Sequence, residues 1–330
     1  MTELGWAGGF TILTREGRLV FDPDSTRSCG QNCSVFISHA HADHFTGLRS
    51  KSPKYSTPQT RRIFECIHGK PVKNFYNIEF NKPIRVGDAE ITPINAGHML
   101  GSTQFLVTLP DETILYTGDI NYTDTLTTVR AERAECDVLV MEATYGEPSY
   151  VFPDRESVYN SIVTWALSRI AQGTLPSFKV YAAGKAQELI RLFNTFTNLE
   201  VITDKMISKI SEVYSASGYQ MRHRELNVTR DRSPSIYLTA DSKTFSSEEY
   251  ARAVTTGWAL RMNAKSFAAF PLSSHADFSQ LLQFIKDCRA KKVYIFTGYM
   301  DVFADYVRRK LGVASRPLPA LPQKTLCSFH

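Results

Sequence analysis

Four side chains able to bind a metal ion crowd into one short run near the start of the chain, His39-Ala40-His41-Ala42-Asp43-His44. The run follows the apolar stretch 35–38, where the pattern predicts the end of a strand. Imidazole and carboxylate ligands together suit zinc, and less often iron or manganese. A purely structural role explains the run poorly, because four buried polar side chains would each need hydrogen-bond partners. The spacing therefore predicts a metal centre.

Two later residues can complete this centre. His98 lies between Gly97 and Gly101, where the backbone can approach a crowded site, and Asp119 follows the predicted strand 113–116. Two metal ions about 3.5–4 Å apart can ionise a water and neutralise the oxygens of a phosphodiester, which is a poor, negatively charged electrophile. We expect one ion to be held by His39, His41 and His98, and the other by Asp43, His44 and Asp119, with Asp119 bridging the two.

The predicted secondary structure that must position these residues changes along the chain. The first half reads as short strands separated by Gly, Asp and Pro, which predicts a sandwich or layered α/β fold. These strands are 10–14, 18–22, 34–38, 84–86, 90–94, 104–109, 113–116 and 138–142. From about Tyr150, helices and strands alternate, which predicts a parallel sheet. This part contains a helix capped by Asp154 and ending at Gly173, then strand 178–183, helix 185–196, strand 200–203 and helix 205–216.

The rest of the chain returns to a third style. We expect an irregular, basic stretch at 220–235, then strand 266–271, helix 277–287, strand 292–296, helix 302–311 and a proline-punctuated extended tail at 316–322. The chain thus reads as a β-rich first part, an inserted αβ unit and a return. We place these three parts at residues 1–150, 151–265 and 266–330.

In this order and spacing, the histidine-rich run, His98 and Gly118-Asp119 resemble the signature of the metallo-β-lactamase superfamily. Asp22, at the end of the second predicted strand, is similar to the early aspartate that supports the site in that family. The resemblance implies an α/β fold of four layers, an αβ/βα sandwich, with the metal ions at one edge of the sheets.

Three further segments resemble the β-CASP branch of that superfamily, which includes ribonuclease J, Artemis and the cleavage-and-polyadenylation endonuclease. Glu142, in Glu142-Ala143-Thr144-Tyr145-Gly146, is similar to the acidic motif of the branch, and His275, in Ser273-Ser274-His275-Ala276-Asp277, to its second motif. The start of the predicted helix at 184–189 resembles one in the inserted β-CASP domain. In its length and in the residues of its motifs, the chain is similar to ligase-associated DNA exonuclease-like proteins and to archaeal mRNA 3′-end processing factors.

The resemblance implies a nuclease that hydrolyses the phosphodiester bonds of single-stranded DNA or RNA with a metal-activated hydroxide. A 5′ exonuclease is favoured over an endonuclease, because the inserted domain would narrow the cleft over the metal ions. Two zinc sites are implied, with manganese as the alternative metal. His275 would be the general acid toward the leaving oxygen, oriented by Glu142, with Asp43 and Asp22 completing the catalytic set. Candidates for contacts with the substrate phosphate are Lys185, Ser273 and Ser274.

Thr297 departs from the family pattern. RNA-processing members carry a histidine in the corresponding strand–loop, whereas this chain reads Tyr294-Ile295-Phe296-Thr297-Gly298. Threonine is a poor zinc ligand, so we expect the second metal site to be weak. DNA-directed members such as Artemis also lack this histidine, but the residues after His275 resemble the RNA and ligase-associated members. The choice between DNA and RNA therefore stays open.

Composition narrows the remaining classes. The net charge of +5 suits a polyanionic partner, although the pI near 8.8 is below that of a dedicated nucleic-acid module. No apolar run approaches the length of a membrane span, and the start of the chain lacks a secretory signal, so we expect a cytoplasmic protein without membrane contact. The six scattered cysteines predict reduced thiols, with a Cys29–Cys33 disulfide as the alternative. The resemblance suggests a DNA ligase or RNA-processing proteins as partners.

Two other functions stay open. A small-ester or thioester hydrolase of the superfamily would lack the Glu142 and His275 motifs and the inserted unit. A non-catalytic scaffold subunit would have lost metal ligands, and only Thr297 fits that description. Elsewhere, the basic residues between Arg222 and Arg232 could contact a nucleic-acid backbone, and Tyr122 and Tyr145 could stack on bases. The ordinary alternatives are solvated charges and aromatic packing.

Overall fold

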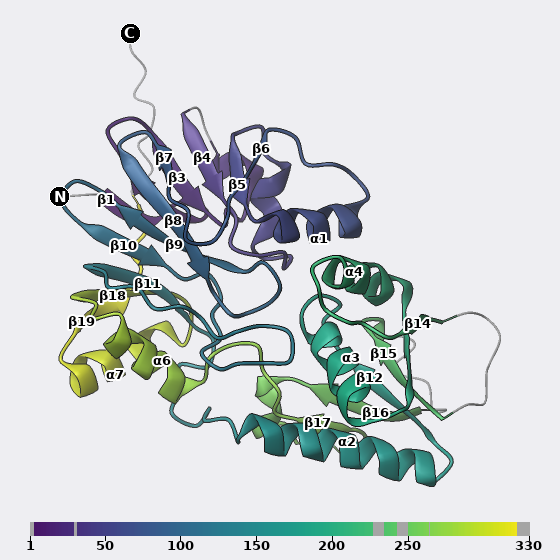
Figure 1. The fold of residues 1–330 in the computed structure, drawn as a ribbon. Helices are drawn as coiled ribbons and strands as arrows, with labels where there is room; N and C mark the ends of the chain where they lie inside the picture. Colours follow the sequence, from purple (N-terminus) through teal and green to yellow (C-terminus); the bar gives the residue numbers. More distant parts are fainter. Residues whose placement is uncertain (1–2, 30–31, 227–233, 243–249, 264, 322–330) are drawn as a thin grey trace.

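Three sheets and the helices around them make up the molecule (Figure 1). The computed structural model describes residues 3–29, 32–226, 234–242, 250–263 and 265–321. Sheet A has the order β1-β2-β3-β4-β5-β6. Its strands are β1 (Glu3–Trp6), β2 (Phe10–Leu13), β3 (Arg18–Phe21), β4 (Cys33–Phe36), β5 (Lys54–Ser56) and β6 (Phe75–Asn77).

Sheet B has the order β19-β18-β11-β10-β9-β8-β7 and combines the first part of the chain with its end. Its strands are β7 (Ile84–Val86), β8 (Ala89–Asn95), β9 (Thr103–Thr108), β10 (Thr113–Tyr116), β11 (Val138–Ala143), β18 (Lys292–Gly298) and β19 (Ala314–Pro317). The neighbouring strands β11 and β18 pair in parallel although about 150 residues separate them in sequence. The return segment is therefore part of the same sheet as the first part.

Sheets A and B pack face to face through a core of buried aromatic and branched side chains. The Phe10 and Tyr116 rings lie 5.2 Å apart, and Phe36 meets Phe105 at 5.5 Å. The other face of sheet A is covered by η2 (Phe45–Arg49) and α1 (Pro58–His68), through Phe45 and Phe64. The other face of sheet B is covered by α6 (Phe278–Asp287) and α7 (Met300–Leu311). This arrangement is the four-layer αβ/βα sandwich that the sequence predicted.

Sheet C belongs to the inserted unit, which lies beside the sandwich in Figure 1. Its order is β14-β13-β15-β12-β16-β17, and every strand pairing described in it is parallel. The strands are β12 (Leu175–Lys179), β13 (Glu200–Thr203), β14 (Arg224–Glu225), β15 (Ser235–Thr239), β16 (Tyr250–Thr255) and β17 (Ala268–Phe270), and the helices are α2 (Arg155–Ala171), α3 (Lys185–Phe196) and α4 (Lys205–Ser215). The predicted parallel sheet is confirmed.

The inserted unit shares its core with the loops that follow the strands of the sandwich. Ala40, Met99 and Leu100 are buried in the same cluster as the side chains of α3 and β12. The Leu100 amide also donates a hydrogen bond of 3.2 Å to the Tyr214 hydroxyl on α4. These contacts hold the inserted unit against the histidine-rich loop. The position of the inserted unit relative to the predicted metal ligands is therefore fixed.

Most predicted elements of the first half match a strand to within two residues, and Asp154 caps α2 as expected, accepting from the Ser157 amide at 3.0 Å. The sequence patterns missed β1, β5, α1, β6, β14, β15, β16 and β19, which are short or have few apolar positions. They also predicted a strand at 178–183, three residues later than the start of β12. Strand β17 pairs with β16 in sheet C. Since β17 ends at Phe270, we propose that the inserted unit extends to about that residue instead of ending at 265.

One edge of the sandwich collects the loops that carry the predicted ligands. Strands β8, β10, β11 and β18 run in the same direction, because β8 and β10 both pair antiparallel with β9, and β11 pairs in parallel with β10 and β18. The loop after β4 joins this edge through a hydrogen bond of 2.9 Å from the Thr103 amide to the Ser38 carbonyl. The carboxyl ends of β4, β8, β10 and β11 therefore meet where the metal centre was predicted. None of the helices in the described part of the chain is both long enough and apolar enough to cross a membrane.

Candidate metal centre and active site

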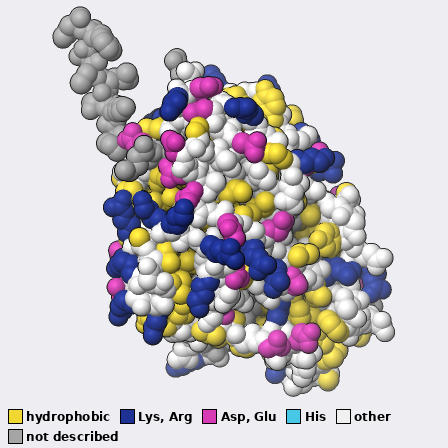
Figure 2. All heavy atoms as spheres, turned by 60° about the vertical axis from the view of Figure 1, so that its left-hand side comes forward, with side chains coloured by type: hydrophobic (Ala, Val, Ile, Leu, Met, Phe, Trp, Pro, Cys, Tyr) yellow, Lys and Arg dark blue, Asp and Glu magenta, His cyan; other side chains and the backbone are white. Residues whose placement is uncertain are grey.

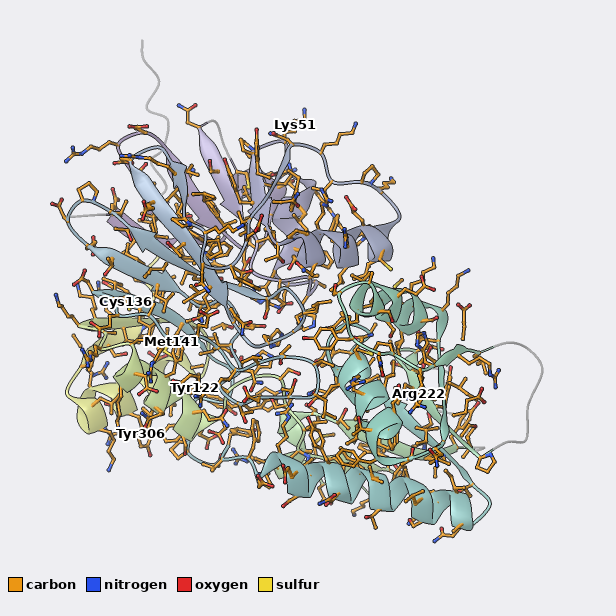
Figure 3. The ribbon with its side chains drawn as sticks, in the orientation of Figure 1. Lys51, Tyr122, Cys136, Met141, Arg222 and Tyr306 are labelled. Atoms are coloured by element: carbon orange, nitrogen blue, oxygen red, sulfur yellow. The ribbon has the colours of Figure 1, made fainter. Side chains whose placement is uncertain are left out.

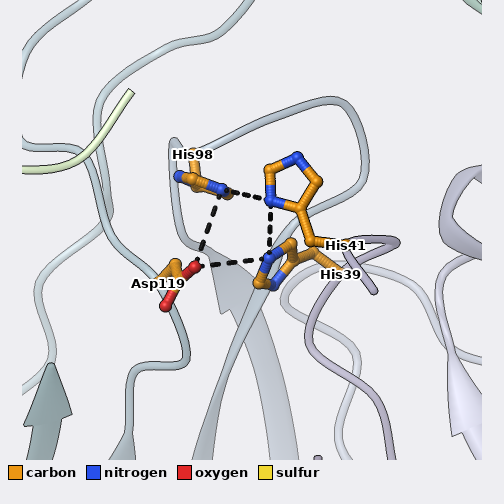
Figure 4. A group of neighbouring side chains, drawn as sticks. All are labelled: His39, His41, His98 and Asp119. Atoms are coloured by element: carbon orange, nitrogen blue, oxygen red, sulfur yellow. Dashed lines mark hydrogen bonds and ion pairs between the residues drawn. The ribbon is translucent and has the colours of Figure 1, made fainter. Parts of the chain in front are cut away.

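Three imidazole rings and one carboxylate converge at this edge (Figure 4). The Nδ1 atom of His41 lies 3.1 Å from the Nε2 atoms of both His39 and His98. The Oδ2 atom of Asp119 is 3.4 Å from Nε2 of His39 and 3.8 Å from Nε2 of His98. The structure thus brings together the four ligands that the sequence assigned to the first metal ion and to its bridge.

The second nitrogen of each ring is bonded outward. His41 donates to the Ala183 carbonyl at 3.2 Å, and His98 donates to the Ser274 carbonyl at 2.7 Å. The hydroxyl of Ser38 donates to Asp22, so the Nδ1–H of His39 is the donor across the 2.9 Å contact with Ser38. Each neutral ring therefore has its hydrogen outside and its lone pair inside, the orientation that outer hydrogen bonds impose on metal-binding histidines.

Electrostatics keeps these rings neutral. Burial, followed by the neighbouring histidines, holds the pKa values of His39 and His98 well below their usual range. Burial lowers the pKa of His41 to about 4. Three neutral rings whose inward lone pairs face one another at 3.1 Å cannot hydrogen-bond among themselves, and a cation between them would relieve their repulsion. The donor set therefore fits a metal ion such as zinc.

A second, more open group lies beside the first. The Nε2 atom of His44 is 3.4 Å from Oδ1 of Asp119 and 3.6 Å from Oδ2 of Asp43, whose side chain is 80% exposed. The other ring nitrogen of His44 donates to Asp22 at 2.8 Å. Burial lowers the pKa of His44, but the carboxylates of Asp119 and Asp22 outweigh it and raise that pKa to about 10. A second metal ion bound here would therefore displace a proton.

Asp22 supports both groups without touching the inward nitrogens. Its carboxylate accepts from the Ser38 amide at 2.7 Å, from the Tyr116 hydroxyl at 3.0 Å and from His44. It therefore orients His39 through Ser38 and His44 directly. The sequence named Asp22 as a catalytic residue, and its contacts are those of a positioning residue.

His275 and Glu142 form a pair next to the bridging carboxylate. The Nδ1 atom of His275 lies 2.8 Å from Oε1 of the fully buried Glu142, and its Nε2 atom lies 4.0 Å from Oδ2 of Asp119. Glu142 also accepts from the amides of Ile120 and Thr144. Burial would lower the pKa of His275, but the charges of Glu142 and Asp119 raise it to about 9. The ring is thus protonated at neutral pH and presents an N–H beside Asp119.

The segment that carries the two ligand groups resembles a known family. Residues 23–161 match the family model described as the beta-lactamase superfamily domain. The chain carries a β-lactamase superfamily domain. A crystal structure of a protein of unknown function from Enterococcus faecalis V583 superposes with a TM-score of 0.67 at 14% identity, covering 97% of this chain and 98% of that one, which supports the fold alone.

Relatives of this superfamily domain carry nuclease and ligase names. The chain is 28% identical to a probable DNA ligase of Opitutus terrae, over 83% of this chain and 28% of that protein. It is 32% identical to an RNase J-like protein of Methanocaldococcus jannaschii, over 64% of this chain and 57% of that protein. It is 26% identical to the 5′ exonuclease Apollo of Gallus gallus, over 79% and 58%. The chain thus spans less than two thirds of each relative, and the resemblance to the β-CASP branch is confirmed.

A cavity of about 830 Å³ opens above the two ligand groups of the superfamily domain. Its walls come from the metal loops, from two segments of the inserted unit (181–185 and 255–258) and from the loop around His275. Thr297 lines this cavity in the bulged end of β18, paired with Glu142. The threonine therefore stands at the wall of the open ligand group, where the family pattern has a histidine.

The three predicted phosphate contacts also line the cavity, but each has a structural partner. Lys185 lies 3.0 Å from Glu188, and burial, only partly offset by Glu188, lowers the pKa of its ammonium to about 8. The Ser273 hydroxyl accepts from the His275 amide at 2.9 Å, and the Ser274 carbonyl holds His98. Their hydroxyl and ammonium groups border the substrate space, and their substrate role stays a proposal.

Other residues singled out in the sequence lie elsewhere. Tyr122, labelled in Figure 3, packs its ring against Phe284 of α6 and donates to Asp287. Arg222, also labelled there, donates to the Asn194 carbonyl on α3, and Arg224 pairs with Glu200 at 2.7 Å. Arg230 and Arg232 lie outside the described residues. The face in Figure 2 carries Lys and Arg interspersed with Asp and Glu, so the net charge does not mark an entry path there.

Sequence reasoning missed the groups that hold the ligands in place. The Ala183 and Ser274 carbonyls carry no side-chain signal, because any residue supplies a carbonyl. Arg155 was also missed, although it links the start of α2 to Glu188 at 3.0 Å and to the Ser273 carbonyl at 3.0 Å. A basic residue directly after a helix cap, facing an acidic residue in a later helix, is the signal that could have found it.

Proposed function

We propose that this protein is a metal-dependent nuclease that hydrolyses phosphodiester bonds in single-stranded nucleic acid. One observation carries the proposal: His41, His98 and Asp119 of the first ligand group line one cavity with His275, which is paired with the buried Glu142. A metal site beside a separate proton donor suits the displacement of a poor leaving group.

The residues have distinct roles in this proposal. His39, His41, His98 and Asp119 would hold one metal ion, and Asp43 and His44 would add a second that shares Asp119. We propose zinc because histidine nitrogens dominate, with manganese as an alternative. When bound, the metal supplies a water of lowered pKa and positive charge for the phosphate oxygens.

His275 supplies the proton. The attacking oxygen bonds to phosphorus while the phosphorus–oxygen bond to the leaving group breaks. The leaving oxygen then takes the proton from Nε2 of His275. Glu142 holds the opposite nitrogen at 2.8 Å and stabilises the charged ring before transfer. The buried Glu142 is itself fixed by two backbone amides, so the direction of the N–H is set before the substrate arrives.

The names of the relatives point to nucleic acid as the substrate and include both DNA-directed and RNA-directed proteins. Two proteins named as DNA ligases align with 83% and 84% of this chain, and others are named as RNases. We propose DNA as the principal substrate and a DNA ligase as a functional partner, with RNA as the alternative. The name of the chicken relative, a 5′ exonuclease, supports attack from the 5′ end. We further propose a cytoplasmic location.

A non-catalytic scaffold is the second candidate, because Thr297 replaces an expected ligand. The intact geometry of the first ligand group and of the His275–Glu142 pair favours the enzyme. An ester or thioester hydrolase would have no use for that pair or for the inserted unit.

The experiment is a digestion of matched single strands. Chelator-stripped protein is loaded with zinc or manganese and given DNA and RNA of one sequence, labelled at the 5′ end, with a 5′-phosphate or a 5′-hydroxyl. We expect metal-dependent release of mononucleotides from the 5′ end of DNA. Cleavage that persists in chelator, or no cleavage of any strand with either metal, would refute the proposal. A ladder of internal cleavage products would show an endonuclease instead of a 5′ exonuclease, and a preference for RNA would replace DNA as the proposed substrate.

A further inference from the structure

We propose that Tyr181 and Trp258 are stacking platforms for two bases of an unpaired strand, one on each side of the phosphate that is cut. This inference rests on the proposed nuclease function and adds the feature that selects a single strand. Both rings line the cavity over the metal ligands, and both are large apolar groups left open to solvent.

Tyr181 is 69% exposed, yet it is held beside a ligand of the first metal group. Its ring centre lies 6.0 Å from that of His41, and its carbonyl accepts from the Ala186 amide at 3.2 Å. The neighbouring Ala183 carbonyl accepts from His41. The loop between β12 and α3 therefore carries Tyr181 at a fixed place on the cavity wall, with one face free.

Trp258, on η3 (Gly257–Arg261), is 40% exposed and has a rigid support. Its ring lies 4.8 Å from Tyr145 and 5.3 Å from Tyr150. A Cβ atom at Gly257 would come within 2.5 Å of the Tyr145 ring, so only glycine lets η3 approach this closely. One side of Trp258 is thus packed, and the other faces the cavity.

A row of ring contacts joins the two platforms through the reaction centre. From Tyr181 the row runs to His41 at 6.0 Å, to His98 at 4.9 Å and to His275 at 4.5 Å. It continues to Tyr145 at 6.0 Å and ends at Trp258 at 4.8 Å. The first metal group and the proton donor occupy the middle of the row, and the exposed rings occupy its ends. A strand whose phosphate lies at the middle would run toward Tyr181 on one side and toward Trp258 on the other.

Basic side chains contribute little to binding a nucleic-acid backbone inside this cavity. Among the described residues that line it, Lys185 is the only lysine or arginine, and its ammonium is paired with Glu188. Stacking on an aromatic ring strengthens the binding of a base by about tenfold or more and tolerates any sequence. Bases in a duplex have both faces covered, so the platforms would favour an unpaired strand.

The test separates base stacking from contacts with the backbone. Metal-loaded protein is given two 5′-phosphorylated strands of equal length, oligothymidylate and a chain of abasic tetrahydrofuran nucleotides, which carry the same phosphates. We expect the wild type to cleave oligothymidylate with the higher kcat/KM. Trp258→Ala and Tyr181→Ala should each lower that value about tenfold, which corresponds to the loss of one stacked base. On the abasic strand the loss should stay within about twofold, since no stacked base is removed.

Conservative variants and a matched surface variant complete the test. Trp258→Phe and Tyr181→Phe keep a ring and should retain most of the activity on oligothymidylate. Tyr76→Ala removes a tyrosine that is 51% exposed on β6 but lies outside the cavity, so it should change neither strand. Equal losses on both strands, or wild-type activity in both alanine variants, would overturn the inference and leave the nuclease proposal intact. Wild-type protein that cleaves no strand with metal would overturn both.

Discussion

The two ligand groups share Asp119 but differ in how completely the fold encloses them. In the first, His39, His41 and His98 are buried or nearly so, and each has its outer nitrogen bonded to a fixed group. In the second, Asp43 is 80% exposed and Thr297 stands where a ligand is expected. We infer that the fold prepares the first metal site in advance, whereas the second is completed only when a substrate enters the cavity.

The largest effect should come from breaking the enclosed group. His98→Ala removes an inward nitrogen and leaves the Ser274 carbonyl unpaired, so we expect nuclease activity to fall to background. Loss of an outer partner alone costs about 10–100-fold in metal affinity or activity, and loss of the ligand should exceed it. Activity and bound zinc are measured together. His223→Ala, a histidine on the inserted unit that bonds Ser208, is the control, and activity retained by His98→Ala would contradict the enclosed site.

The next effect tests the proton donor, which lies beside Asp119, the carboxylate that the two groups share. His275→Asn keeps a polar side chain but removes the N–H beside Asp119, so hydrolysis of a strand should slow by about 10²–10⁴-fold. A p-nitrophenyl phosphodiester has a leaving group that needs no proton, and its hydrolysis should fall far less. Equal losses on both substrates would mean that His275 serves the metal site instead of the leaving group.

Glu188 tests how the inserted unit holds the enclosed group. Burial raises its pKa, but Arg155 and Lys185 outweigh burial and lower that pKa to about 2. Its unfolded value is near 4.5, so the charged pair stabilises the fold above about pH 4.5, and this stabilisation is lost as the pH falls toward 2. Glu188→Gln strands two buried cations and should cost about 3 kcal/mol of unfolding free energy at pH 7.

Urea titrations at pH 7 and pH 3 provide the measurement for Glu188→Gln. The gap between the wild type and the variant should narrow at pH 3, because Glu188 of the unfolded wild type is mostly protonated there and must lose its proton on folding. Glu200→Gln, which breaks the partly exposed pair with Arg224, is the matched control and should cost far less. A gap that stays constant with pH would show that Glu188 acts by packing alone.

A similar contrast separates the site residues that could be predicted from the sequence from those that could not. The ligands were predictable because each metal-binding side chain has a rare type and a fixed place after a strand, as His39 to His44 have after β4. The holders of these ligands were not predictable, because the carbonyls of Ala183 and Ser274 belong to segments about 140 and 180 residues away. Trp258 looked like any other aromatic residue until η3 placed it on Tyr145. Chemistry carried by side chains is visible in sequence, whereas chemistry carried by backbone and by packing needs the fold.

The smallest expected effect would make the open group resemble the enclosed one. Thr297 follows the bulge of β18, pairs with Glu142 and lines the cavity with Asp43 and His44. In Thr297→His, an imidazole would add a ligand to this group, and we expect the second metal ion to bind about tenfold more tightly while the first is unchanged. Isothermal titration of stripped protein with zinc measures both affinities, and Thr297→Gln, of similar length without an imidazole, is the control. Unchanged affinity and stoichiometry in Thr297→His would mean that residue 297 does not face the second ion. Weak binding at that site would then be attributed to the exposure of Asp43.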